Sequence, residues 1–135
     1  MEKWEWAVIA AWIDTEGSIG APKSSRGERY YLQVVISQRD PAPLKWLQSR
    51  VGGNLCRTAR GGFRLQVSSQ EAKRMLEGAL PYFLSKGRQA ELGIELGNKR
   101  RGSPKGRFGG STSLVPSERQ KEIHDELSRL KHLVY

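Results

Sequence analysis

Residues 30–37, YYLQVVIS, alternate in side-chain polarity and predict a β-strand with one buried face. The apolar side carries Tyr30, Leu32, Val34 and Ile36, and the other side carries Tyr31, Gln33, Val35 and Ser37. We expect residues 18–23 to pair with this strand through a turn at residues 24–29. A second hairpin is predicted around Gly61-Gly62, a dipeptide typical of tight turns, which lies between NLCRTAR and FRLQVSS.

Helical patterns precede, separate and follow the two hairpins. They are found in residues 4–15, 39–53, 68–80, 87–97 and 117–133. Asp40 suits the cap of the second helix, because its carboxylate can accept hydrogen bonds from the first turn. Ser68 and Glu71 have the spacing of a capping box at the start of the third.

This arrangement predicts an α+β fold in which a four-stranded antiparallel sheet, made of two hairpins, is covered on one face by helices. The element order is αββαββα followed by C-terminal helices. A chain of 135 residues fits a single domain, with a core at about residues 4–97, a basic loop at 98–116 and a C-terminal helix at 117–133. The loop composition fits a disordered linker as well as a segment that contacts nucleic acid.

Several classes of protein are excluded by composition. The single cysteine, Cys56, rules out an internal disulfide bond. No apolar run approaches the roughly 20 residues that span a bilayer, and the acidic N-terminus does not resemble a signal peptide. We therefore expect a soluble, intracellular protein, cytoplasmic in a prokaryote or located in an organelle, with no membrane partner.

The charge balance points to a polyanionic partner. Lysine and arginine total 23 against 14 acidic residues, which gives a net charge of +9. Duplex DNA, with about one charge per 1.7 Å of its axis, attracts such a protein strongly. The predicted sheet also presents a polar face with hydrogen-bonding side chains: Arg29, Tyr31, Gln33, Arg64, Gln66 and Ser68. A two-stranded ribbon fits the major groove and can read bases there, although a merely hydrated face is common in antiparallel sheets.

Two carboxylates, Asp14 and Glu16, follow the first predicted helix in the stretch AAWIDTEGSIG, residues 10–20. Negative charge at this end of a helix is opposed by the helix dipole. A divalent cation would offset that cost, and Mg²⁺ is typically held by one or two carboxylates together with substrate phosphates. The D-x-E-G spacing alone, however, is also common in surface turns.

Residues 9–19, IAAWIDTEGSI, resemble the LAGLIDADG motif of homing endonucleases. Ile9 stands at the first leucine of the motif, Ala10 at its alanine and Ala11 at its first glycine, while Asp14, Glu16 and Gly17 stand at the closing acid, acid and glycine. The sequence departs from the motif where Trp12 is bulky, Thr15 replaces a small residue and Glu16 replaces an aspartate. The longer glutamate keeps an oxygen ligand but changes the metal geometry.

The resemblance implies a fold and an active site. The family fold has the element order predicted above, so the resemblance covers about residues 4–97. It implies catalytic roles for Glu16, for Gln38 in ISQRD and for Lys86 in PYFLSKGRQAEL, although Lys86 could also be an ordinary surface lysine. It further implies Mg²⁺, or another divalent cation such as Mn²⁺, held by Glu16 and the backbone carbonyl of Gly17. Asp14 is the secondary metal candidate and is expected rather to brace the helix junction.

A single motif copy implies a homodimer. The small residues Ala7, Ala10 and Ala11, with Asp14, would form the contact between two motif helices, although such a stripe is also typical of an ordinary core. The implied activity is intron-encoded, site-specific cleavage of both DNA strands at a long pseudo-palindromic site, which leaves short 3′ overhangs and involves no small-molecule substrate. The alternatives are a catalytically inactive DNA- or RNA-binding relative, an intron RNA maturase, and a basic RNA-associated structural protein.

The residues expected to contact DNA lie in both hairpins, in the helix at 87–97 and in the basic loop. They are Ser18, Lys23, Ser24, Arg26, Arg29, Tyr31, Gln33, Arg57, Arg60, Arg64, Gln66, Ser68, Arg88, Lys99, Arg100, Arg101, Lys105 and Arg107.

Overall fold

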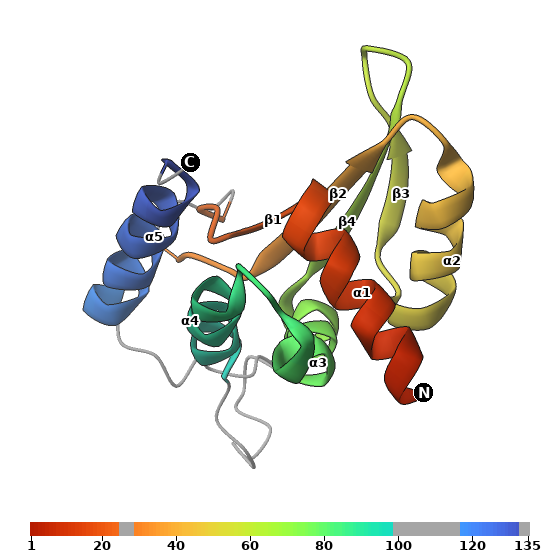
Figure 1. The fold of residues 1–135 in the computed structure, drawn as a ribbon. Helices are drawn as coiled ribbons and strands as arrows, with labels where there is room; N and C mark the ends of the chain where they lie inside the picture. Colours follow the sequence, from red (N-terminus) through yellow and green to blue (C-terminus); the bar gives the residue numbers. More distant parts are fainter. Residues whose placement is uncertain (25–28, 99–116, 133–135) are drawn as a thin grey trace, which may run out of the picture.

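The computed structural model of the chain describes residues 1–24, 29–98 and 117–132 (Figure 1). Its elements are α1 (Lys3–Glu16), β1 (Gly17–Gly20), β2 (Gln33–Gln38), α2 (Pro41–Val51), β3 (Asn54–Arg57), β4 (Phe63–Ser68), α3 (Ser69–Ala79), the 3₁₀ turn η1 (Leu80–Tyr82), α4 (Gly87–Gly97) and α5 (Ser117–His132). The four strands form one antiparallel sheet in the order β1-β2-β4-β3. The predicted α+β architecture is confirmed.

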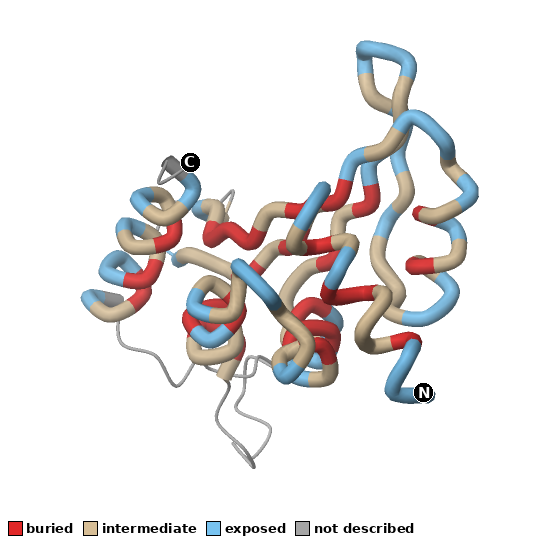
Figure 2. The backbone as a smooth tube through the Cα atoms, in the orientation of Figure 1, coloured by how far each residue is buried: buried red, intermediate tan, exposed pale blue. Residues whose placement is uncertain are grey.

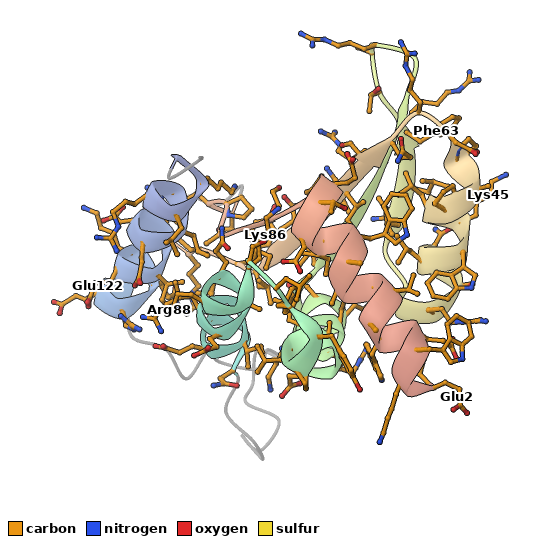
Figure 3. The ribbon with its side chains drawn as sticks, in the orientation of Figure 1. Glu2, Lys45, Phe63, Lys86, Arg88 and Glu122 are labelled. Carbon is orange, nitrogen blue, oxygen red and sulfur yellow. The ribbon has the colours of Figure 1, made fainter. Side chains whose placement is uncertain are left out.

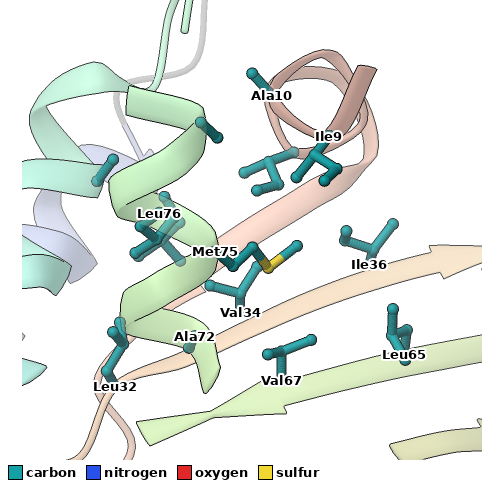
Figure 4. Packing of buried hydrophobic residues seen from close by; sticks show 14 of the residues in the cluster. Ile9, Ala10, Leu32, Val34, Ile36, Leu65, Val67, Ala72, Met75 and Leu76 are labelled. Carbon is teal, nitrogen blue, oxygen red and sulfur yellow. The ribbon is translucent and has the colours of Figure 1, made fainter. Parts of the chain in front are cut away.

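The core lies between the sheet and the helices packed on one of its faces. Val34 is aligned with Ile19 and Val67 on the neighbouring strands, so alternate residues of three strands place apolar side chains on the same side. These residues are fully or almost fully buried, together with Ile9 of α1 and Met75 of α3. The close packing of this cluster is visible in Figure 4, and Figure 2 shows that burial is concentrated where α1, α3 and α4 face the sheet.

The first hairpin is interrupted in a way that the alternation did not indicate. β2 begins at Gln33 rather than at Tyr30, and the regular pairing with β1 stops at Gly20. Beyond that point, only an isolated bridge joins Lys23 to Tyr30. Pro22 has no N–H to donate, and its carbonyl accepts a hydrogen bond from the Tyr31 N–H over 3.0 Å, so a continuous ladder is not possible here.

The two predicted caps differ in outcome. The Asp40 carboxylate accepts a hydrogen bond from the Ala42 N–H over 2.9 Å and caps α2 as expected. Ser68 stands at the cap of α3, but its side chain makes no capping hydrogen bond. Ser68 is still paired with Gln33 in the sheet, so its side chain lies on the polar face of the sheet rather than over the first turn of the helix.

The C-terminal helix is an integral part of the fold. In α5, Ile123 and Leu127 are almost fully buried, and the helix packs against β1 and α4 (Figure 1). The ring Nδ1 of His124 lies 2.7 Å from the carbonyl oxygen of Ala21, which ties α5 to the segment after β1. No helix in the described part of the chain is both long and apolar enough to cross a membrane.

Candidate active site and nucleic-acid interface

Asp14 joins the end of α1 to the loop that precedes α4. Its carboxylate accepts hydrogen bonds from the backbone N–H groups of Leu84 (2.8 Å), Ser85 (3.2 Å) and Lys86 (2.9 Å), and from the Ser85 hydroxyl (3.1 Å). Burial alone would raise the pKa of Asp14, but these donors outweigh it and the pKa is lowered. Asp14 therefore braces this junction, as the sequence suggested.

Lys86 is held at the C-terminal end of α1 by this loop (Figure 3). Its ammonium donates hydrogen bonds to the backbone carbonyl of Ile13, over 2.9 Å, and to that of Gly17. Burial of the side chain lowers the pKa of Lys86, against the opposing influence of the Asp14 and Glu16 carboxylates. Lys86 is thus no ordinary surface lysine, because it is half-buried and faces the junction between α1 and β1.

Glu16 and Gln38 line the same hollow at the end of α1, of about 310 Å³, together with Trp12 and Thr15. The Glu16 side chain is exposed and forms no hydrogen bond or ion pair with any residue described by the structure. The Gln38 amide oxygen accepts a hydrogen bond from the Arg39 N–H over 2.9 Å. The three residues expected to be catalytic, Glu16, Gln38 and Lys86, therefore come from α1, β2 and the loop before α4 and surround the same helix end.

The oxygen donors at this point suit a hard cation. A free carboxylate on Glu16 is the kind of ligand that Mg²⁺ takes alongside substrate phosphates, whereas the neighbouring Gly17 carbonyl already accepts a hydrogen bond from the Lys86 ammonium. Within residues 1–24, 29–98 and 117–132, no three histidine, cysteine, aspartate or glutamate side chains gather closely enough to hold an ion. Asp14 is a poor ligand, because both of its oxygens already accept hydrogen bonds.

The sheet face that points away from the helices is largely polar, with Val35 as an apolar residue in one of its rows. Its side chains form rows along the strand pairing: Ser18, Val35, Gln66 and Asn54 in one row, Ser37, Arg64 and Cys56 in the next, and Gln33 with Ser68 in a third. Five of the predicted DNA contacts thus share one surface: Ser18, Gln33, Arg64, Gln66 and Ser68. Sequence reasoning missed Asn54, which the same alternation would have found once β3 was paired with β4 in register.

Two other predicted DNA contacts lie elsewhere. Arg57 is aligned with Phe63 in β4, so its side chain points to the opposite face of the sheet from that of Arg64. The Arg57 guanidinium lies 5.7 Å from the centre of the Phe63 ring. Arg88 of α4 forms an ion pair with Glu126 of α5 over 3.2 Å, which gives it a role within the chain. Both side chains therefore already interact with other residues of the chain in the absence of nucleic acid.

All of the predicted DNA contacts remain predictions, and eleven of them lie outside these two groups. Five are described: Lys23, Ser24, Arg29 and Tyr31 lie in the segment between β1 and β2, and Arg60 lies in the β3–β4 turn. Six lie outside the described residues: Arg26, Lys99, Arg100, Arg101, Lys105 and Arg107.

The predicted contact face of α1 needs correction. Ala10 is completely buried against the core of its own chain, and Asp14 is taken up by the loop at 84–86, so neither is available to a second helix. The side of α1 that faces outward instead carries Trp4, which is 59% exposed, with Val8, Ala11 and Thr15. These four residues, hereafter the outer face of α1, fall at helical spacing. The small-residue stripe is therefore divided between the core and the surface.

Known proteins match this chain in fold but not in sequence. No sequence-family model matches the chain, and no curated protein matches it. Among solved structures, the homing endonuclease I-CvuI in complex with a DNA target and Mg is similar, with 20% identity, 98% of each chain covered and a TM-score of 0.66. The archaeal intron-encoded homing endonuclease I-Vdi141I, complexed with DNA, has 18% identity, with 100% of this chain and 89% of that chain covered, and a TM-score of 0.68.

A longer protein is also similar. The LAGLIDADG meganuclease I-CpaMI, bound to uncleaved DNA, has 18% identity and a TM-score of 0.59, and this chain covers 52% of its length. At such identities the likeness establishes the fold. It also extends the expected match, because coverage of 98% includes the C-terminal helix that the motif resemblance had left out.

Proposed function

We propose that this chain, which has the fold of the LAGLIDADG homing endonucleases, is a metal-dependent DNA endonuclease that works as a homodimer. The observation that carries the proposal is the convergence of Glu16, Gln38 and Lys86 at the end of α1, next to the polar face of the sheet. The reaction is hydrolysis of one phosphodiester bond in each strand at a long pseudo-palindromic site, with short 3′ overhangs as products.

Each of the three residues has a chemical task. Glu16 would hold Mg²⁺, which would supply charge stabilisation at the phosphate and acidify bound water. The Lys86 ammonium is fixed close to this position and can donate to an anionic phosphoryl oxygen, an interaction that strengthens as charge develops. Gln38 carries both a donor and an acceptor and can orient the attacking water.

A dimer follows from the number of sites required. One chain has one Glu16 and one Lys86 at this position, whereas two strands need two cleavage sites. The outer face of α1 is apolar and close to Glu16, so pairing two such faces would bring both sites to the same short stretch of duplex. A two-fold symmetric protein then meets a near-palindromic sequence. The similarity to I-CpaMI, whose length is about twice that covered by this chain, supports the same arrangement.

Sequence recognition is assigned to the polar face of the sheet. Arginine and glutamine side chains, such as those of Arg64 and Gln66, can make bidentate hydrogen bonds to base edges in the major groove. The net charge of +9 adds the salt-dependent attraction to phosphates.

The proposal is tested by finding a target and then removing one carboxylate. Selection from a randomised duplex library yields the bound sequence, and cleavage is measured on it with Mg²⁺ or with EDTA. We expect Glu16→Gln to bind with nearly unchanged affinity and to lose cleavage. The matched control is Glu91→Gln, which changes an exposed carboxylate on α4 and should cut normally. Cleavage by Glu16→Gln at the wild-type rate would show that the site is wrong, and binding without cleavage in any metal would favour the inactive relative.

A further inference from the structure

A hollow of about 250 Å³ lies between β1, the start of β2 and the C-terminal helix. Five of its lining residues carry hydrogen-bond donors, namely Ser18, Gln33, His124, Ser128 and Lys131, and of these His124 already contacts the Ala21 carbonyl. Ser18 and Gln33 belong to the polar face of the sheet, so the hollow is continuous with the surface proposed to bind DNA. Sequence reasoning assigned no binding role to α5.

The Lys131 ammonium lies over β1 at Gly20, a residue without a side chain. A Cβ atom at Gly20 would lie only 3.0 Å from the Lys131 Nζ, so glycine at this position leaves the room that the lysine occupies. Gly20 is aligned with Gln33, which places the ammonium on the polar side of the sheet. The lysine therefore projects from α5 onto the nucleic-acid surface rather than into the core.

The positive charge of Lys131 is not neutralised by a neighbour within the described part of the chain. Arg119 of the same helix is paired with Glu95 over 2.5 Å, and Arg129 lies 3.8 Å from the Glu126 carboxylate. Lys131 forms no ion pair with a described carboxylate. An exposed cation that is left unpaired, beside two hydroxyls and an amide, is suited to an oxyanion.

The hollow is also close to the cleavage centre. β1 begins directly after Glu16, and Gly20 is its last residue. Among the influences that lower the pKa of Lys86, burial is the largest, and the charge of Lys131 adds to it. The two amines are therefore near enough to feel each other's field.

We infer that Lys131, with Ser128, Ser18 and Gln33, forms a binding site for a backbone phosphate of the duplex, next to the phosphate that is cleaved. The inference rests on the proposed function and adds α5 to the nucleic-acid interface. The contact is to the backbone and therefore carries no sequence information. A dimer would have two such sites, one for each half of the target.

The test is the salt dependence of binding to the selected duplex, measured in the Glu16→Gln background so that no DNA is cut. Each phosphate contact contributes about 0.9 to the slope of log K against log salt, so Lys131→Gln should reduce the slope by about 2 per dimer. Lys131→Arg should restore it. The matched control is Lys45→Gln, which removes an exposed lysine of α2 at the opposite end of the molecule (Figure 3) and should leave the slope unchanged.

The outcomes separate this inference from the proposed function. An unchanged slope for Lys131→Gln, or an equal reduction for Lys45→Gln, overturns the phosphate site while leaving the endonuclease intact. Failure of the parent protein to bind any duplex would refute both. A loss of affinity at one base position only would also overturn the inference, because a backbone contact weakens all sequences alike.

Discussion

Replacing Asp14 by asparagine tests whether one carboxylate holds the loop at residues 84–86 in place. The Oδ1 atom accepts three hydrogen bonds, from the Ser85 N–H, the Ser85 hydroxyl and the Lys86 N–H, and Oδ2 accepts the one from the Leu84 N–H. An asparagine whose oxygen takes the Oδ1 position turns its NH₂ group toward the Leu84 N–H. That bond is then lost, and the other three become neutral.

The cost follows from these four contacts. A hydrogen bond to a charged group contributes about 1.5–3 kcal/mol, and water recovers part of this at a partly exposed site. We therefore expect Asp14→Asn to lower the free energy of unfolding by about 2 kcal/mol, which corresponds to a fall in Tm of roughly 8 °C for a chain of this size. Cleavage should fall as well, because the same loop carries Lys86.

The effect should depend on pH in a defined direction. The pKa of Asp14 is lowered in the folded protein, so its stabilisation is complete above the ordinary carboxyl pKa of about 3.9. It is lost as the pH falls through the lower folded-state value. Asparagine does not titrate, so the difference in stability between wild type and variant should shrink in acid.

Thermal denaturation followed by circular dichroism at pH 7 and near pH 3 measures both effects. Ser85→Ala is the control, because it removes only the hydroxyl bond and should cost less than about 1 kcal/mol. Equal Tm values for wild type and Asp14→Asn at pH 7 would refute the bracing role. A difference that persists undiminished in acid would refute its electrostatic origin.

Three further predictions concern α1 and the sheet. Ala11→Glu places a charge on the outer face of α1 and should convert the proposed dimer to a monomer in sedimentation experiments, with a Tm that no longer rises with protein concentration; an unaffected dimer would exclude this face. Gly17→Ala should lower the free energy of unfolding by about 2 kcal/mol in chemical denaturation, because a Cβ atom at residue 17 would lie 2.8 Å from the Ile13 Cα. Wild-type stability of this variant would contradict the close packing at this junction. Arg64→Ala should relax selectivity at one position in each half-site, at a cost of about 1–3 kcal/mol in binding measurements on variant targets; a uniform loss across sequences would make it a phosphate contact.

Periodicity explains how much of the fold could be predicted from the sequence. Alternation over residues 30–37 and around Gly61-Gly62 identified both hairpins, because a half-buried strand must repeat every two residues. The same pattern could not locate the break at Pro22, where the missing N–H ends the ladder. Nor could it show that the Ser68 side chain remains with the sheet.

The candidate site was predictable only where a motif marked it. Glu16, Gln38 and Lys86 came from the motif and its flanking patterns, and the structure places all three around one helix end. Helical spacing grouped Ala10 with Ala11, but it could not reveal that α1 packs on its neighbours so that one alanine is buried and the other exposed. Lys131 was missed, because nothing local to α5 indicates that it packs beside β1.

The proposed mechanism requires each subunit of a dimer to supply one Glu16 and to cut one strand. A heterodimer of wild-type and Glu16→Gln subunits, isolated through two different affinity tags and given a supercoiled plasmid with the selected target, tests it directly. We expect nicked circles to accumulate at about half the rate at which the wild type breaks the first strand, because the heterodimer has one active site instead of two. Conversion to linear DNA at the wild-type rate would contradict it.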